Sequence, residues 1–121
     1  NNTFDKRPWG SFEVLLDTPF LKVKKLNIDC NKRISYQYHE HRSEHWVVIK
    51  GKATVKLNSK IFELNEGESI DIKKRNNHYV GNFTDENLIL IEVQMGDYFG
   101  EDDINRIDDP YNRVIQNVNK K

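Results

Sequence analysis

Between residues 9 and 96 the sequence alternates short runs of strand-like composition with clusters of turn-forming residues. Gly, Asn, Asp, Ser or Pro gather at 17–19, 50–52, 58–60 and 65–67, where turns are expected. Many short strands at this spacing predict a β-sandwich or β-barrel rather than a helical fold. The expected strands are Phe12–Leu16, Leu21–Ile28, Ile34–His39, His45–Ile49, Ala53–Leu57, Ile61–Leu64, Ser69–Ile72, Tyr79–Phe83 and Leu88–Gln94.

The length of 121 residues is that of one domain, so we predict a single domain over 1–121 with its core at about 7–113. Past Gly96 charged residues become frequent and apolar residues sparse. There we expect a short helix over 101–107, because the acids at 101–103 would lie in its first turn.

Composition excludes several classes of protein. The 19 Lys and Arg balance the 19 Asp and Glu, and no basic run is longer than 73–75, which argues against a nucleic-acid binder. The apolar stretches fall far short of the roughly 20 residues that span a bilayer. The first residues lack the apolar segment of a secretion signal, and one cysteine excludes an intrachain disulfide. We expect a cytoplasmic ligand-binding or enzymatic domain that binds neither nucleic acid nor membrane.

The histidines suggest a metal site. Three of the four lie within seven positions, and strand alternation places Gln37 and His39 on one face. Glu44 starts the expected antiparallel return strand, where its carboxylate can lie opposite that pair, and His78 would arrive from another strand. Amide, imidazole and carboxylate ligands suit a divalent ion, with Zn²⁺ first and Mn²⁺, Fe²⁺, Co²⁺ or Ni²⁺ as alternatives. Spacing alone leaves open that these are polar side chains of an ordinary sandwich.

Two segments resemble the motifs of a known fold family. From Gln37 to Gly51 the pattern Q-x-H-x4-E-x6-G resembles the first cupin motif, with Gln where most cupins have the first His. From Gly67 to Asn82 the pattern G-x5-K-x-R-x2-H-x3-N resembles the second motif, with Lys and Arg in place of its usual Pro and Gly. The resemblance implies an all-β cupin, a double-stranded β-helix or jelly-roll barrel with a short C-terminal helical segment.

A closer resemblance is to the type II phosphomannose isomerases, over about residues 7–113. In that family the cupin unit is often the C-terminal part of a bifunctional enzyme whose N-terminal part is a mannose-1-phosphate guanylyltransferase of GDP-mannose and polysaccharide biosynthesis. The closing Tyr-Gly-Arg of the family is replaced by Tyr111-Asn112-Arg113. The matching segments are RPWG at 7–10, SYQYHEHRSEHWVV at 35–48, IEVQ-x-G-x-Y at 91–98 and GEDDI-x-R at 100–106.

The resemblance implies a metal-dependent mannose-6-phosphate isomerase, which forms fructose 6-phosphate through an enediolate. A divalent ion at the predicted site would stabilise the oxyanion. The candidates for the residue that moves the proton are Glu92, His45 and His41, with Glu92 and His45 as the first choices. Each has a plain alternative: Glu92 as a polar residue of the barrel mouth, and His45 as a packed ring beside Trp46.

The phosphate of such a substrate needs cations. Arg106 is the first choice, supported by Arg42 and Arg113, because a guanidinium can grip phosphate oxygens in pairs. Tyr98 is expected to contact the sugar. All four can instead be surface or packing residues. The resemblance also implies a homodimer.

Two rival functions remain. One is a non-catalytic or differently specific cupin that binds a sugar phosphate or a nucleotide sugar. The other is a different metal cupin, an oxygenase or an epimerase. The run from Gln37 to Trp46 favours the isomerase, because the barrel itself hosts many chemistries.

Overall fold

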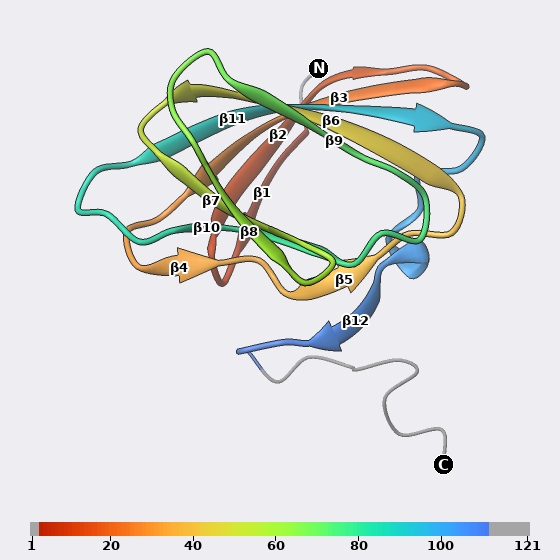
Figure 1. Ribbon diagram of the computed structural model, residues 1–121. Helices are drawn as coiled ribbons and strands as arrows, with labels where there is room; N and C mark the ends of the chain where they lie inside the picture. The colour runs from red at the N-terminus through yellow and green to blue at the C-terminus, as the bar shows by residue number, and fades with distance from the viewer. Residues whose placement is uncertain (1–2, 112–121) are drawn as a thin grey trace.

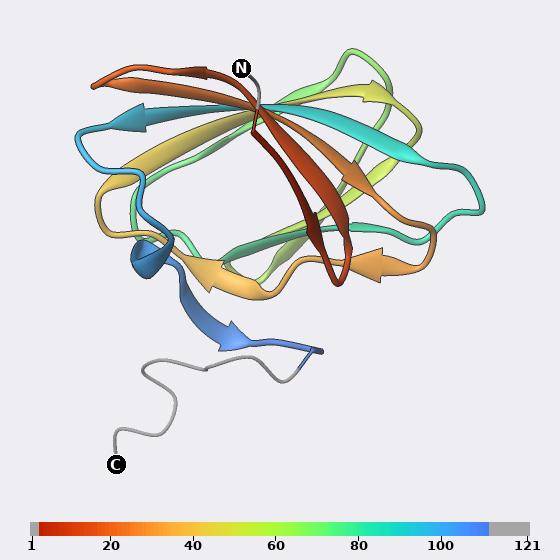
Figure 2. The same cartoon turned by 180° about the vertical axis from the view of Figure 1, so that it is seen from behind.

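In the computed structural model, which describes residues 3–111, antiparallel strands form two β-sheets that face each other around a common core (Figure 1). One sheet has the order β1-β2-β3-β11-β6-β9 and the other β12-β5-β10-β7-β8, with β4 also paired to β10. From behind, the red β1–β2 hairpin lies nearest the viewer and the blue β12 runs beside β5 (Figure 2). The strands are β1 (Thr3–Arg7), β2 (Gly10–Asp17), β3 (Leu21–Ile28), β4 (Lys32–Arg33), β5 (Tyr36–Tyr38), β6 (Arg42–Lys50), β7 (Ala53–Leu57), β8 (Lys60–Leu64), β9 (Ser69–Ile72), β10 (His78–Asn82), β11 (Leu88–Gly96) and β12 (Asn105–Asp108).

The predicted all-β fold is confirmed, and β3, β7 and β9 have the predicted bounds. The expected strand Ile34–His39 is shorter, because β5 covers only Tyr36–Tyr38. The expected pairing of this strand with the one that carries Glu44 is wrong. β5 pairs with β10 and β12, whereas β6 pairs with β11 and β9, so the chain crosses from one sheet to the other between them.

The predicted helix over 101–107 is reduced to one 3-10 turn, η1 (Glu101–Asp103). The prediction is wrong beyond that turn, because the chain becomes β12 and pairs Asn105 with Tyr38 and Arg106 with Gln37. An isolated helix of two turns is marginal in water, whereas the free edge of β5 offers partners for the backbone groups.

The interior changes from apolar to polar along three adjacent strands. The register places Leu90 of β11 opposite Leu26 and Val48, and Glu92 opposite Lys24 and Trp46. One step along β11 thus divides an apolar end of the barrel from a polar end. The buried apolar residues at the first end of β3, β6 and β11 are Leu26, Ile28, Val48, Leu88 and Leu90, and the buried polar residues at the other are Lys24, Arg42, Glu44, Glu92 and Gln94.

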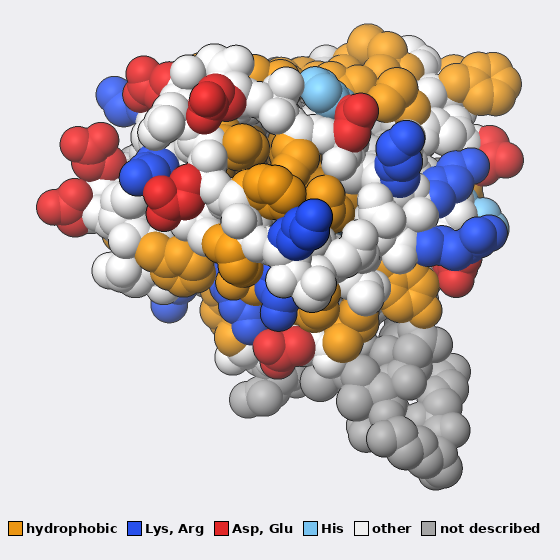
Figure 3. Space-filling model, viewed as in Figure 1, with side chains coloured by type: hydrophobic (Ala, Val, Ile, Leu, Met, Phe, Trp, Pro, Cys, Tyr) orange, Lys and Arg blue, Asp and Glu red, His pale blue; other side chains and the backbone are white. Residues whose placement is uncertain are grey.

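Apolar side chains also lie on the surface, in the middle of the face seen in Figure 1, with charged side chains around them (Figure 3). Ile61 and Phe62 of β8 are 56% and 39% exposed, and the same edge strand carries Lys60 and Glu63. Charges on an edge strand discourage pairing with a second chain. Residues 3–111 contain no helix long and apolar enough to cross a membrane.

A candidate metal centre beside a cation-lined cavity

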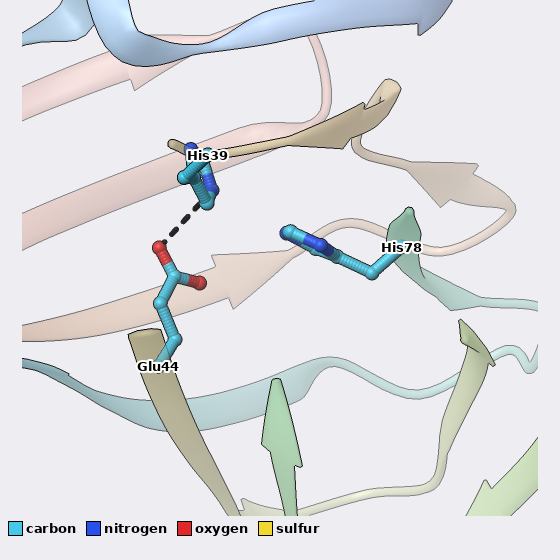
Figure 4. Close-up of side chains that lie close together, drawn as sticks. All are labelled: His39, Glu44 and His78. Atoms are coloured by element: carbon cyan, nitrogen blue, oxygen red, sulfur yellow. Dashed lines mark ion pairs between the residues drawn. The ribbon is translucent and has the colours of Figure 1, made fainter. Parts of the chain in front are cut away.

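Three predicted ligands converge inside the barrel. His39 follows β5, Glu44 lies on β6 and His78 begins β10, and their side chains point toward one another (Figure 4). His39 Nε2 is 3.2 Å from Glu44 Oε2, and the two imidazole centroids are 5.0 Å apart. One ligand atom of each residue lies within 4.8 Å of the others, and all three side chains are buried. This is the size of a group that can surround one ion.

Both imidazoles are oriented by backbone carbonyls. His39 Nδ1 lies 3.0 Å from the carbonyl oxygen of Asp103, and His78 Nδ1 lies 2.8 Å from that of Asn76. A carbonyl oxygen only accepts, so each Nδ1 carries a proton, and Nε2 is the ring nitrogen that faces the interior. Burial, together with His39, lowers the pKa of His78 to about 4, so this ring is neutral near pH 7.

The buried Nε2 of His78 has no hydrogen-bond partner within residues 3–111. An orphaned buried acceptor is costly, and a bound cation would satisfy it. An Nδ1–H donated to a carbonyl with Nε2 facing inward is the arrangement of metal-binding histidines. The histidine geometry therefore fits a divalent ion.

Glu44 supplies the negative charge. Its Oε2 accepts from Arg42 Nε at 2.8 Å and its Oε1 from Trp46 Nε1 at 2.9 Å. Burial alone would raise the pKa of Glu44, but His39, a hydrogen bond from Glu92 and the Arg42 guanidinium together hold that pKa well below its usual value. Glu44 is therefore an ionised ligand candidate.

Gln37 lies beside this group but is turned differently from the prediction. It shares a face with Ser35 and His39, as predicted, and its Nε2 is 3.5 Å from His39 Nε2. Its Oε1 accepts from the Ser35 hydroxyl at 2.6 Å. A half-turn of the amide would present oxygen instead of nitrogen to the histidine.

Glu92 is a second buried carboxyl next to the metal candidates. Trp46 Nε1, which donates to Glu44, is also 3.3 Å from Glu92 Oε2, and Gln94 Nε2 donates to Glu92 Oε1 at 3.2 Å. Burial raises the pKa of Glu92 well above the usual carboxyl value, and the charge of Glu44 adds to this. The two neighbouring carboxyls of the site thus have pKa values shifted in opposite directions, downward for Glu44 and upward for Glu92.

A cavity between the sheets adjoins this group, and Gln37 and Glu92 are part of its lining. Arg106 lines it from β12, with its side chain 18% exposed and its Nε 4.0 Å from Asp109 Oδ2. Arg42 lines it from β6 and is buried against Glu44. Two predicted phosphate-binding arginines therefore face one cavity. The complete lining is Arg7, Trp9, Phe12, Lys24, Leu26, Ile34, Gln37, Arg42, Glu92, Gln94, Glu101, Ile104 and Arg106.

The structure does not bring every predicted residue to this cavity. His45, one of the two first choices for proton transfer, lies away from the cavity, because alternation along β6 turns Glu44 and Trp46 inward and His45 outward, where its Nδ1 is 2.5 Å from Asp71 Oδ1. Tyr98 is 44% exposed, donates to the carboxylate of Asp102 and is not part of the cavity lining. Arg113 lies outside the described residues.

The sequence analysis missed Arg7 and Lys24 in the cavity lining. Lys24 shares the inward face of β3 with Leu26 and Ile28. A lysine in an otherwise apolar alternation is the sequence feature that could have indicated its place in the cavity lining. Arg7 has no such signal, since the pairing of β1 with β2 places it there.

The role of Asp103 was also missed. Its carboxylate accepts from the backbone N–H groups of Glu40 and His41, at 3.0 and 2.9 Å. It thus fixes the loop that follows His39, and its carbonyl oxygen orients the His39 ring.

Comparison with known proteins finds relatives that match most of the chain. Residues 2–109 match the family model described as "Mannose-6-phosphate isomerase C-terminal". The chain is 40% identical over 110 residues to the alginate biosynthesis protein AlgA of Pseudomonas aeruginosa, which covers 91% of this chain and 23% of that protein. It is also 40% identical over 107 residues to a mannose-1-phosphate guanylyltransferase of Escherichia coli, covering 88% of this chain and 23% of that protein. The chain therefore spans about a quarter of the length of these relatives.

The fold is that of solved cupins. The cupin domain of Cnp3 from Schizosaccharomyces pombe superposes with a TM-score of 0.69 at 16% identity, over 72% of this chain and 64% of that one. At this identity the likeness shows the fold alone. It confirms the predicted cupin barrel.

Proposed function

Because the chain belongs to the mannose-6-phosphate isomerase C-terminal family, we propose that it interconverts mannose 6-phosphate and fructose 6-phosphate with a divalent ion bound in the barrel. The observation that carries the proposal is the double contact of Trp46. Its Nε1 reaches Glu44 at 2.9 Å and Glu92 at 3.3 Å, so a candidate metal ligand and a second carboxyl with a raised pKa are held side by side. A proton shift next to a carbonyl is favoured by a base that moves the proton and by a cation that stabilises the oxyanion.

His39, Glu44 and His78 would hold the ion, with Gln37 as a fourth ligand after rotation of its amide. Imidazole and carboxylate ligands suit Zn²⁺ first, with Mn²⁺, Fe²⁺, Co²⁺ or Ni²⁺ as alternatives. When bound, the ion supplies a Lewis acid that stabilises negative charge on the substrate oxygens.

Glu92 moves the proton between C2 and C1 of the sugar. It lines the cavity, and Trp46 and Gln94 fix the two oxygens of its carboxyl group. As a carboxylate it accepts the proton from one carbon, and as an acid it returns the proton to the other. Its raised pKa brings the two forms closer in free energy near neutral pH than in an ordinary glutamate.

Arg106 and Arg42 would face the phosphate, because both line the cavity from which Glu92 is reached. The roles of Arg113 and Tyr98, the homodimer and the cytoplasmic location stay predictions. A place in GDP-mannose or polysaccharide biosynthesis is part of the proposal, and the names of the relatives support it.

The test is a coupled assay for fructose 6-phosphate formed from mannose 6-phosphate, run with purified protein before and after chelation. We expect turnover that chelation abolishes and one of the candidate ions restores. Turnover that persists in the metal-free protein would contradict the metal role. Binding of mannose 6-phosphate without turnover in any metal form would assign the chain to the non-catalytic sugar-phosphate cupins.

A further inference from the structure

Four cations from four strands meet at the cavity: Arg7, Lys24, Arg42 and Arg106. Lys24 is 6% exposed and Arg42 is 3% exposed. Lysine and arginine are seldom buried to this degree unless anions compensate them. The positive charge therefore requires a negative partner inside the cavity or at its rim.

Glu101 of η1 is that partner for two of the cations, but its contacts are long. Its carboxylate oxygens lie 3.5 Å from Arg7 Nη2 and 3.8 Å from Lys24 Nζ. Within residues 3–111 the contact with Glu101 is the ion pair of the Lys24 ammonium. The Arg7 guanidinium has a second acid nearby, because its Nη1 also lies 3.6 Å from Asp5 Oδ2. Both distances to Glu101 exceed ordinary hydrogen-bond lengths, so the carboxylate is loosely held.

The two cations are fixed more firmly than the carboxylate. The Arg7 guanidinium and the Lys24 ammonium both lie over the Phe12 ring, at 4.8 and 4.3 Å from its centroid. The Glu101 side chain is 54% exposed, compared with 7% for Lys24. Glu101 can therefore turn into solvent while the cations keep their places.

A donor in the same cavity is unused. Arg42 Nη1 is buried and has no hydrogen-bond partner in the described part of the chain, although Arg42 Nε is bound to Glu44. A single carboxylate at the rim cannot satisfy donors on three strands. An anion with three terminal oxygens can.

We propose that the Glu101 carboxylate occupies the phosphate position in the free protein, and that a phosphate monoester displaces it to bind Arg7, Lys24 and the free Nη1 of Arg42. Glu101 is then a specificity residue. A phosphate dianion brings more negative charge to Arg7 and Lys24 than the Glu101 carboxylate that it displaces. A neutral sugar brings none, so displacing Glu101 would leave both cations without a counter-charge. Only the identity of the sugar rests on the proposed function.

The experiment titrates inorganic phosphate, mannose 6-phosphate and neutral mannose into the metal-loaded full chain by calorimetry. Glu101→Gln removes the competing charge at nearly constant size, so phosphate and mannose 6-phosphate should bind about three- to tenfold more tightly. Lys24→Met should weaken both about tenfold or more, and Arg7→Met tests the same subsite if the lysine variant does not fold. Glu63→Gln is the matched control, because Glu63 is 60% exposed and pairs with Lys52 away from the cavity.

Unchanged or weaker phosphate binding by Glu101→Gln would overturn the inference, and so would an equal gain for neutral mannose. The outcome is separable from that of the isomerase assay. Tighter phosphate binding without turnover keeps the subsite and removes the proposed reaction. If the protein turns over its substrate but Glu101→Gln does not change phosphate binding, the proposed reaction is supported and the phosphate subsite is contradicted.

Discussion

The two ends of the barrel interior are built by the same strands but have opposite chemistry. At one end Val48, Leu88 and Leu90 are fully buried among apolar side chains. At the other end Glu44 and Glu92 are buried nearly as deeply, yet each accepts hydrogen bonds from neighbouring side chains. Buried polar groups destabilise a fold unless they are paired. We therefore expect substitutions at the apolar end to act mainly on stability, and substitutions at the polar end to act mainly on the proposed metal binding and turnover.

The largest effect is expected at the polar end, from His78→Ala. The variant loses a buried ligand, so metal content should fall and turnover should drop about a thousandfold or more, since a Lewis-acid ion contributes several kcal/mol. The melting temperature of the metal-free protein should also fall, because the variant loses the Nδ1–H bond to the Asn76 carbonyl and the packing of a fully buried ring against Trp46. Metal analysis, the coupled assay and thermal unfolding measure these three quantities.

His45→Ala is the matched control for that experiment. It removes the same ring from the outer face of β6, where His45 contacts Asp71. Metal content and turnover should equal those of the unchanged protein. A large loss of turnover in this variant would show that the outward position of His45 is not the one used in catalysis.

The next largest loss of turnover is expected from Glu92→Gln. The amide keeps the shape of the side chain but cannot take up and return a proton, so kcat should fall by about 10²–10⁴-fold. Metal content should be unchanged, because Glu92 is not one of the three converging ligands. If the ion is lost together with activity, Glu92 supports the metal site and the proton is moved by another group.

At the apolar end, Leu90→Ala should lower stability and leave turnover unchanged. Leu90 is fully buried, so its truncation should lower the free energy of unfolding by about 2–5 kcal/mol. The kcat of the remaining folded protein should be unchanged. Ile91→Ala, one position along and only partly buried on the outer face, should cost less. Denaturant unfolding compares the two, and a kcat loss in Leu90→Ala would mean that the two ends are coupled.

Patterns of turns and alternation predicted an all-β sandwich or barrel, and the resemblance to the cupin motifs added the cupin barrel and four metal ligands, of which His39, Glu44 and His78 converge. Sequence alone could not assign His45, since alternation shows which residues share a face but not which face is inside. On β6 both faces carry large apolar residues: Trp46 and Val48 point inward, Val47 and Ile49 outward. The inner face became clear only from the pairing of β6 between β9 and β11.

The cation-lined cavity was only half predicted for a different reason. Arg7 and Glu101 are far apart in sequence and meet because β1 and η1 close over the same end of the barrel. Such a contact depends on the tertiary arrangement and has no local pattern. The predicted helix over 101–107 was wrong for the same reason, because residues 105–108 pair with the edge of β5, a tertiary contact that has no local sequence pattern.

The smallest effect tests how the polar end is held in place, through the acids of η1. Glu101 faces cations and Asp102 accepts from Tyr98, but both oxygens of Asp103 accept backbone N–H groups of the loop after His39. Asp103→Asn would set an amide NH₂ against one of these donors and leave that donor unsatisfied. The loop should shift and carry the His39 ring with it.

Metal affinity of Asp103→Asn should therefore fall about 10- to 100-fold, as expected for residues that orient a ligand. Saturating metal should restore kcat, because His39 itself remains. Asp102→Asn, one residue away in the same turn, should leave metal affinity unchanged, since Asp102 contacts neither the loop nor a ligand. Competition with a chromogenic chelator measures both affinities. Equal losses in the two variants would mean that the charge of the acidic turn, rather than the hydrogen bonds of Asp103, positions His39.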